Sequence, residues 1–245
     1  VAFSRDDLYL EYVTLLNQLG RYEEAIRMID NHQFHPWEGG EGKVPAQYQL
    51  SRVEQVKKYL KLKEYEKALK LIDECFVYPY NLGEGKLQGA QENDFNYYKG
   101  CILQAMGRGA EAQSLFLKAS MGDSQPVAAM YYNDQKPDKI FYQGLAFLKL
   151  GDEENARSRF NRLIDFGERH LFDRFKMDYF AVSLPDLQIW EDDMNKKNRV
   201  HCNYLMGLGY LGLGNIAKAK SCFDTASHLD NNHQGVQIHN NMINK

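Results

Sequence analysis

The chain has 245 residues, of which 44% are hydrophobic and 26% are charged, so it has enough apolar side chains for a folded core and is not a disordered sequence. Its 30 basic and 33 acidic side chains give a formal charge of −3, which lacks the basic excess that nucleic-acid binding requires. No apolar run in the sequence approaches the ~20 residues of a membrane-spanning helix, which disfavours a membrane protein.

Five short phrases divide the sequence into helical hairpins. They cover residues 19–25, 62–68, 106–112, 150–156 and 213–219, and each lies between two stretches with apolar residues at helical spacing. Four contain a glycine, which we expect to adopt the left-handed conformation that ends a helix; Lys63 replaces it in the second phrase. The pattern predicts five hairpins, at about 6–32, 46–77, 93–120, 137–165 and 199–229.

Small and large residues recur at fixed places within the later hairpins. A glycine precedes the hinge by seven residues, and an alanine followed four residues later by phenylalanine comes after it. Because glycine inside a helix costs ~1 kcal/mol relative to alanine, its recurrence predicts close packing between the paired helices. The residues are Gly100, Gly144 and Gly207, with Ala112/Phe116, Ala156/Phe160 and Ala219/Phe223.

These residues resemble the tetratricopeptide repeat, which has small residues at its eighth and twentieth places and a bulky one at its twenty-fourth. The first two hairpins depart from that pattern with Val13 and Val56 at the eighth place. The resemblance implies an all-α, right-handed solenoid that forms a single domain over 1–245. It also implies a concave groove lined by the first helix of each hairpin, and a role in binding proteins.

The hairpins are spaced more widely than ordinary tetratricopeptide repeats. The hinge alanines at positions 25, 68, 112 and 156 are 43 or 44 residues apart, and the next follows at 219, whereas the usual period is about 34 residues. The additional sequence lies between hairpins, at 31–45, 77–93, 121–137 and 166–198. Apolar periodicity in the last segment predicts a helical insertion over 166–198.

The first two inserts contain the same motif, Pro-aromatic-x-x-Gly-Glu-Gly-Lys, at 36–43 and 79–86. One interpretation is a binding edge; the other is a structural loop in which proline and glycine set the backbone and the aromatic ring covers the core. The Gly-Lys pairs lack the earlier glycine and the following Ser or Thr of a phosphate loop, so this motif does not predict nucleotide binding. The candidate edge residues are Trp37, Glu41, Lys43, Tyr80, Glu84 and Lys86.

A second candidate surface is the groove. The family geometry places an apolar or aromatic residue at the same inward position of each first helix, with a polar residue three places earlier in several of them. Such a ladder could grip a peptide or a neighbouring domain, or it could be the ordinary lining of a tight superhelix. The candidate groove residues are Asp94, Tyr97, Asp138, Phe141, His201 and Tyr204.

The sequence lacks a recognisable catalytic or metal-binding constellation. His228, His233 and His239 lack the i, i+4 spacing of a helical metal pair and predict a solvated polar tail. The four cysteines form no C-x-x-C motif, which favours buried free thiols and a reducing, cytoplasmic compartment. We therefore predict a chain that is not an enzyme and requires no cofactor.

Three longer phrases, at 34–43, 131–144 and 178–187, are similar to the C-terminal helical region of large, poorly characterised bacterial tetratricopeptide proteins. In that family an N-terminal domain of the carbohydrate-active β-sandwich type precedes the repeats, so the resemblance implies a fragment of a longer protein; a start at Val1 fits this. The first functional hypothesis is a scaffold that binds a partner protein or its own N-terminal domain. The second is a sugar site completed by Trp37, Tyr80 or Tyr131/Tyr132. A third possibility is self-association through terminal hairpins that truncation leaves uncapped, in which case oligomerisation would be an artefact of the shortened chain.

Overall fold

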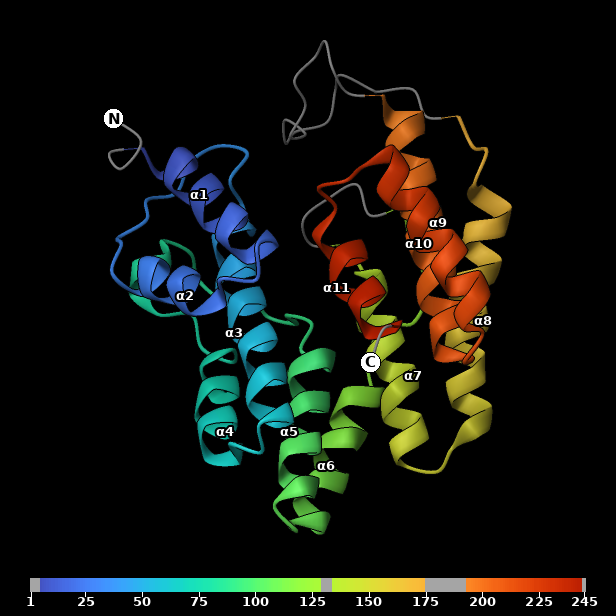
Figure 1. Ribbon diagram of the computed structural model, residues 1–245, viewed down its shortest axis with the longest axis horizontal. Helices are drawn as coiled ribbons and strands as arrows, with labels where there is room; N and C mark the ends of the chain where they lie inside the picture. Colours follow the sequence, from blue (N-terminus) through green and yellow to red (C-terminus); the bar gives the residue numbers. More distant parts are fainter. Residues whose placement is uncertain (1–4, 129–133, 175–192, 244–245) are drawn as a thin grey trace. The chain divides into compact units, whose positions relative to one another are not determined.

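The computed structural model describes residues 5–128, 134–174 and 193–243, and these residues form helices and loops without a β-strand. They divide into two compact units, residues 1–118 and 119–245, which are described separately below (Figure 1). The expected all-α, helical-repeat class is confirmed, whereas the expectation of one continuous solenoid over 1–245 stays a prediction. Among the described helices, none is both long enough and apolar enough to cross a bilayer.

The first unit contains three helical hairpins in chain order. They are α1 (Asp6–Gln18) with α2 (Tyr22–Asp30), α3 (Lys43–Lys61) with α4 (Tyr65–Glu74), and α5 (Asn93–Ala105) with α6 (Gly109–Ser120), whose last two residues fall in the second unit. A short 3-10 helix, η2 (Tyr80–Leu82), lies in the connection between α4 and α5. The helices therefore follow the predicted hairpins closely.

The second unit contains two further hairpins and a final helix. They are α7 (Pro137–Lys149) with α8 (Glu153–His170), α9 (Met194–Gly212) with α10 (Ile216–Leu229), and α11 (Gln234–Ile243). The α7/α8 hairpin continues to His170 and α9 already begins at Met194, so the ends of the predicted insertion belong to hairpin helices. The remainder of that insertion, from 175 to 192, lies outside the described residues.

The hinges have the backbone conformation that the sequence predicts. The glycines at 20, 107, 151 and 214 have φ between 72° and 80°, in the left-handed region. Lys63 occupies the same place in the second hairpin with φ of 60°, and it is the one non-glycine residue with positive φ in the described part of the chain. The second hinge thus keeps the turn geometry at the expense of backbone strain.

The recurring helix glycines allow the paired helices to approach closely. A Cβ atom added to Gly144 would lie 2.3 Å from Cε1 of Phe160, and one added to Gly207 would lie 2.4 Å from Cε1 of Phe223. Gly100 has the same relation to Phe116, at 2.6 Å. The phenylalanine ring of each second helix therefore occupies the space that a side chain on the first helix would fill, which confirms the predicted packing role.

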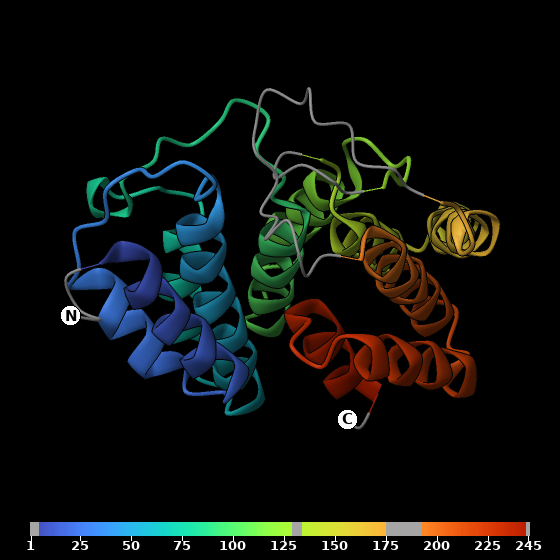
Figure 2. The same ribbon diagram turned by 90° about the horizontal axis from the view of Figure 1, so that it is seen from above.

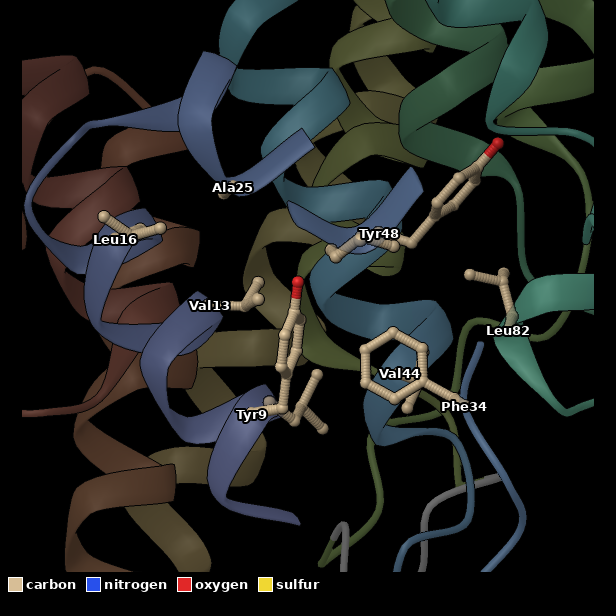
Figure 3. Packing of buried hydrophobic residues seen from close by; sticks show 10 residues of the cluster. Tyr9, Val13, Leu16, Ala25, Phe34, Val44, Tyr48 and Leu82 are labelled. Carbon is tan, nitrogen blue, oxygen red and sulfur yellow. The ribbon is translucent and has the colours of Figure 1, made fainter. Parts of the chain in front are cut away.

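The core of the first hairpins combines helix and loop residues (Figure 3). Val13 and Leu16 on α1 pack with Ala25 on α2 and Val44 on α3, and Tyr9 donates a hydrogen bond of 3.0 Å to the carbonyl oxygen of Met28. Phe34 and Leu82, from the loops after α2 and α4, complete the same cluster, and each is 1% exposed. The inserted loops are therefore part of the core.

A buried arginine links consecutive hairpins of the first unit. Arg52 on α3 is 1% exposed, and its guanidinium lies 3.6 Å from the centroid of the Tyr48 ring. It donates hydrogen bonds to Asp30 at the end of α2, at 2.6 Å, and to Glu74 at the end of α4, at 2.9 Å. Because a buried charge requires such partners, Arg52 fixes the register of α3 against both second helices.

Candidate functional site

The two inserted loops that carry the shared motif lie side by side and interlock (Figure 2). The Asn81 side chain donates hydrogen bonds to the carbonyl oxygens of Ile29 and His32, at 2.8 and 3.1 Å. The backbone N–H of Phe34 in turn donates to the carbonyl oxygen of Asn81, at 2.8 Å. These contacts join the two copies of the motif directly to one another.

Asn81 was not among the sequence-predicted site residues. The equivalent place in the first loop holds Glu38, so Asn81 is not part of the repeated pattern. The only local signal was its position next to Pro79-Tyr80, where asparagine commonly stabilises turns by bonding to backbone groups. Its actual partners lie about fifty residues away in sequence, and repeat spacing does not identify them.

The two charged motif residues of the second loop, Glu84 and Lys86, make contacts with other residues of the same chain. The half-buried Glu84 accepts a hydrogen bond of 2.8 Å from the backbone N–H of Gly42, the residue before α3. Burial raises the pKa of Glu84, and the Gly42 N–H opposes that shift. Lys86 is exposed, donates to the carbonyl oxygen of Phe76 at 2.9 Å and pairs with Glu92. Both side chains help to hold the loop against its surroundings.

The two aromatic residues of the motif have opposite environments. Trp37 is half-buried and packs against the core of the first hairpins, with its indole ring over Gly40, where an added Cβ would lie 2.3 Å from Cε2 of the ring. Tyr80 is 91% exposed. Trp37 therefore covers the core, as the structural interpretation expected, whereas Tyr80 presents its ring to solvent.

The remaining motif residues of the first loop are polar and lie near the start of α3. Glu41 is exposed, and Lys43 is half-buried as the first residue of that helix. Of the six candidate edge residues, Tyr80, Glu41 and Lys86 are therefore exposed, whereas Trp37, Lys43 and Glu84 are half-buried.

The aromatic groove candidates pack within their own hairpins. Tyr97, Phe141 and Tyr204 lie on the first helices, and each contacts the phenylalanine nineteen residues later on the second helix. The ring centroids are 6.0 Å apart for Tyr97 and Phe116, 6.0 Å for Phe141 and Phe160, and 6.3 Å for Tyr204 and Phe223. Phe141 and Tyr204 are only 1% and 5% exposed, so as placed they offer little surface to a ligand.

The final helix covers these residues in the second unit. His239 on α11 is 4% exposed, and its ring lies 5.5 Å from that of Phe141 and 5.7 Å from that of Tyr204. The Tyr204 hydroxyl lies 3.1 Å from Nδ1 of His239, and Gly235 lies directly against the Tyr204 ring. The prediction of a solvated polar tail for this region was therefore wrong, because Gly235 lets α11 approach the Tyr204 ring, and Val236 and His239 are buried.

The three polar groove candidates differ in burial and in the groups that they contact. Asp94 is 8% exposed near the start of α5, and Asp138 is half-buried near the start of α7, 3.8 Å from Nζ of Lys139. His201 is half-buried on α9, and one of its ring nitrogens lies 2.8 Å from the carbonyl oxygen of Val127. Burial lowers the pKa of His201 to about 4, so the imidazole is neutral at pH 7 and suited to this contact.

The described residues contain no group of three or more His, Cys, Asp or Glu side chains arranged to hold a metal ion. The four cysteines are free thiols, with Cys75 and Cys202 buried and Cys101 and Cys222 half-buried. Burial raises the pKa of Cys202 to about 11, which makes its thiol a poor nucleophile at pH 7. These residues therefore behave as packing groups.

Comparison with known proteins finds a match to a tetratricopeptide repeat in one hairpin. Residues 140–165, which span parts of α7 and α8, match the family model of the tetratricopeptide repeat. Among solved structures, the chain is similar to YrrB, a TPR protein with an unusual peptide-binding site, at 14% identity and a TM-score of 0.31 over 97% of this chain and 92% of that one. It is also similar to the C-terminal part of a TPR repeat-containing protein from Cytophaga hutchinsonii, at 14% identity and a TM-score of 0.30 over 94% and 98% of the two chains. Tetratricopeptide repeats generally mediate contacts between proteins.

Proposed function

We propose that the chain is a non-catalytic binding module that holds a partner protein at the loop edge of the first unit, with Tyr80 as the central contact. The supporting observation is the contrast between Tyr80 and its neighbours. The Tyr80 ring is 91% exposed, whereas Leu82, two residues later, is 1% exposed and Asn81 is hydrogen-bonded to the preceding loop. The loop thus holds in place the backbone that carries an exposed aromatic ring.

Such a ring is well suited to protein recognition. Tyrosine is enriched among the residues that contribute most to binding energy, because it combines a large apolar face with a polar hydroxyl and few rotatable bonds. A loop that is already fixed by hydrogen bonds loses little additional conformational entropy when a partner binds. The exposed Glu41 in the neighbouring loop adds a negative charge.

The groove is a weaker basis for the proposal. Phe141 and Tyr204 are covered by α11, so a ligand at these positions would have to displace a helix of the chain itself. The sugar-site alternative has one exposed ring in Tyr80, but Trp37, the other motif aromatic, packs against the core. Docking of an N-terminal domain of the same protein is one form of the proposed protein interaction at Tyr80.

The experiment is a selection of binding peptides followed by affinity measurements on matched variants. A phage-displayed library of random 16-residue peptides is panned against the chain, and the selected peptides are titrated against Tyr80→Ala, Tyr80→Phe and Val77→Ala. Val77 is a suitable control because it is 60% exposed and only three residues away. We expect Tyr80→Ala to weaken binding at least tenfold, and Tyr80→Phe and Val77→Ala to change it by less than threefold.

The same proteins are applied to an array of oligosaccharides. Peptides that bind the Tyr80→Ala variant as tightly as the parent chain would refute the proposed site. Binding to oligosaccharides that depends on Tyr80, in the absence of Tyr80-dependent peptides, would replace the protein-binding proposal with the sugar-binding one.

A further inference from the structure

Two neighbouring arginines on α8 bond to neutral oxygen atoms in the described part of the chain. Arg159 donates a hydrogen bond of 3.1 Å from Nε to the side-chain oxygen of Gln143 on α7. Arg162 donates one of 2.5 Å from Nη1 to the hydroxyl oxygen of Ser124. Both arginines are half-buried. Arg157, on the same helix, instead pairs with a carboxylate, that of Glu153, at 3.7 Å.

The loop after α6 fixes this arrangement. Gln143 is completely buried, and its side-chain amide donates hydrogen bonds to the carbonyl oxygens of Met121 and Asp123, at 3.2 and 2.8 Å. The same side chain thus joins the loop to α7 and orients Arg159 through its oxygen atom. The Arg159 guanidinium also lies 5.1 Å from the centroid of the Phe147 ring. Arg159 is therefore held in position by groups that carry no charge.

The two positive charges lie close together and repel each other. Arg159 and Arg162 are three residues apart, which places them on the same side of the helix. Burial, and then the charge of Arg162, lower the pKa of Arg159, and Asp152 opposes that shift. The Asp152 carboxylate caps α8 by accepting hydrogen bonds from the backbone and side-chain N–H groups of Asn155, at 3.0 and 2.7 Å. The Asp123 carboxylate likewise accepts from a backbone N–H of its own loop, at 3.0 Å. The arginine pair thus keeps a positive charge that a bound anion would neutralise.

The groups at this place match a phosphate group. A guanidinium has five N–H donors in a planar fork, and the contacts above use one donor of each arginine. Because the Ser124 oxygen accepts from Arg162, its own O–H can donate to a ligand. A phosphomonoester carries a charge of about −1.5 to −2 at pH 7 and three acceptor oxygens, so it balances two guanidinium groups. A carboxylate carries a single charge and would balance only one of them.

We propose that Arg159, Arg162 and the Ser124 hydroxyl bind the dianionic phosphate group of a phosphomonoester. The phosphate bridges the two guanidinium forks and replaces their mutual repulsion with attraction to a shared anion. Free small molecules and phosphorylated side chains both carry this group, and titration separates the two sources. The three residues lie in the second unit, so this inference is independent of the proposed contact at Tyr80 in the first.

The test is calorimetric titration of the 245-residue chain with inorganic phosphate, O-phosphoserine and a short Gly/Ser peptide that contains one phosphoserine. Ionic strength is kept constant, because salt screens exposed charges. We expect a dissociation constant of about 0.1–1 mM for at least one probe. Arg159→Gln and Arg162→Gln should each weaken binding at least tenfold. Arg157→Gln removes the same charge from an exposed position of the same helix, so it is the matched control and should change binding less than twofold.

A second variant separates bidentate recognition from charge alone. Arg162→Lys keeps the charge but loses the planar fork, so it should weaken binding about three- to tenfold. Circular dichroism checks that each variant keeps its helix content. Equal affinity for O-phosphoserine and the phosphopeptide would assign the site to free phosphomonoesters, whereas a phosphopeptide bound at least tenfold more tightly would assign it to a phosphorylated protein segment.

Three results would overturn the proposal. The first is the absence of binding by all three probes up to about 20 mM. The second is an Arg162→Gln variant that binds them as tightly as the parent chain. The third is equal binding of the unphosphorylated peptide, which would show that the phosphate group is not what the chain recognises.

Discussion

Replacing Lys63 with glycine should stabilise the first unit, because Lys63 alone among the five hinge residues carries a side chain in the left-handed conformation. Its φ is 60°, whereas the glycines at the other hinges have φ between 72° and 80°. An L-residue in this conformation costs roughly 1–2 kcal/mol, and the greater freedom of glycine in the unfolded chain costs roughly 0.5–1 kcal/mol. The net expectation for Lys63→Gly is a gain of about 0.5–1 kcal/mol in the free energy of unfolding.

The assay is urea denaturation followed by the fluorescence of Trp37. A Trp190→Phe background makes Trp37 the single tryptophan, and its contact with the core of the first hairpins makes it a reporter on that unit. Lys63→Gly should raise the urea midpoint without changing the slope of the free energy with denaturant. The matched exchange, Gly20→Lys, should lower the midpoint by a similar amount, because Gly20 has φ of 72° and its position leaves space for a side chain.

A Lys63→Gly variant no more stable than its parent would refute this reasoning, provided that Gly20→Lys is destabilised. That result would mean that the Lys63 side chain contributes stabilising contacts equal to the strain of its backbone. A loss of stability in both variants would lead to the same conclusion.

Two further predictions concern the second unit. Gly144→Ala should lower the thermal unfolding temperature, with a net loss of up to about 2 kcal/mol, because the new methyl group meets the Phe160 ring and the overpacking cost of about 1–3 kcal/mol exceeds the ~1 kcal/mol gained in helix propensity. Gly109→Ala, at the open first position of α6 in the first unit, is the control. The free energy of unfolding should also fall as the pH drops from about 6.5 to about 4. Burial lowers the pKa of His201 to about 4 in the folded chain, below its value in the unfolded chain, so the unfolded chain takes up a proton first. The stability that the neutral His201 contributes is therefore complete above about pH 6.5 and is lost on acidification. His201→Gln should make urea denaturation less pH-dependent in this window, and an unchanged dependence would contradict the assignment.

The hinges and hairpin contacts were predictable because they depend on local chemistry at fixed intervals. A glycine between two helical patterns is sufficient to place a left-handed turn, and the repeated spacing from Gly144 to Phe160 and from Gly207 to Phe223 is sufficient to place a close helix contact. Even the substitution by Lys63 preserved the turn, since the helices on either side determine where the chain must reverse. These features do not depend on contacts with distant parts of the chain.

The environment of the groove candidates depended on a segment with a weak sequence signal. Half of the residues from 234 to 243 are polar, and the histidines at 228, 233 and 239 suggested an exposed tail. The close packing of α11 depends on Gly235 against Tyr204 and on His239 between Tyr204 and Phe141, which are contacts between distant residues. Equivalent positions in a repeat therefore predict the side of a helix that faces inward, but not what covers it.

The loop motifs show why a repeated sequence does not give a repeated environment when its copies contact one another. Gly40 and Gly83 hold the same place in the two copies, yet Gly40 lies under the Trp37 ring, whereas Gly83 has φ of 73° and faces the carbonyl oxygen of Phe34. Gly83 of the second copy packs against the backbone of the first loop, so it does not lie beneath the Tyr80 ring in the way that Gly40 lies beneath the Trp37 ring. The same contact that joins the loops thus leaves Tyr80 exposed, which connects the architecture of the inserts directly to the proposed binding edge.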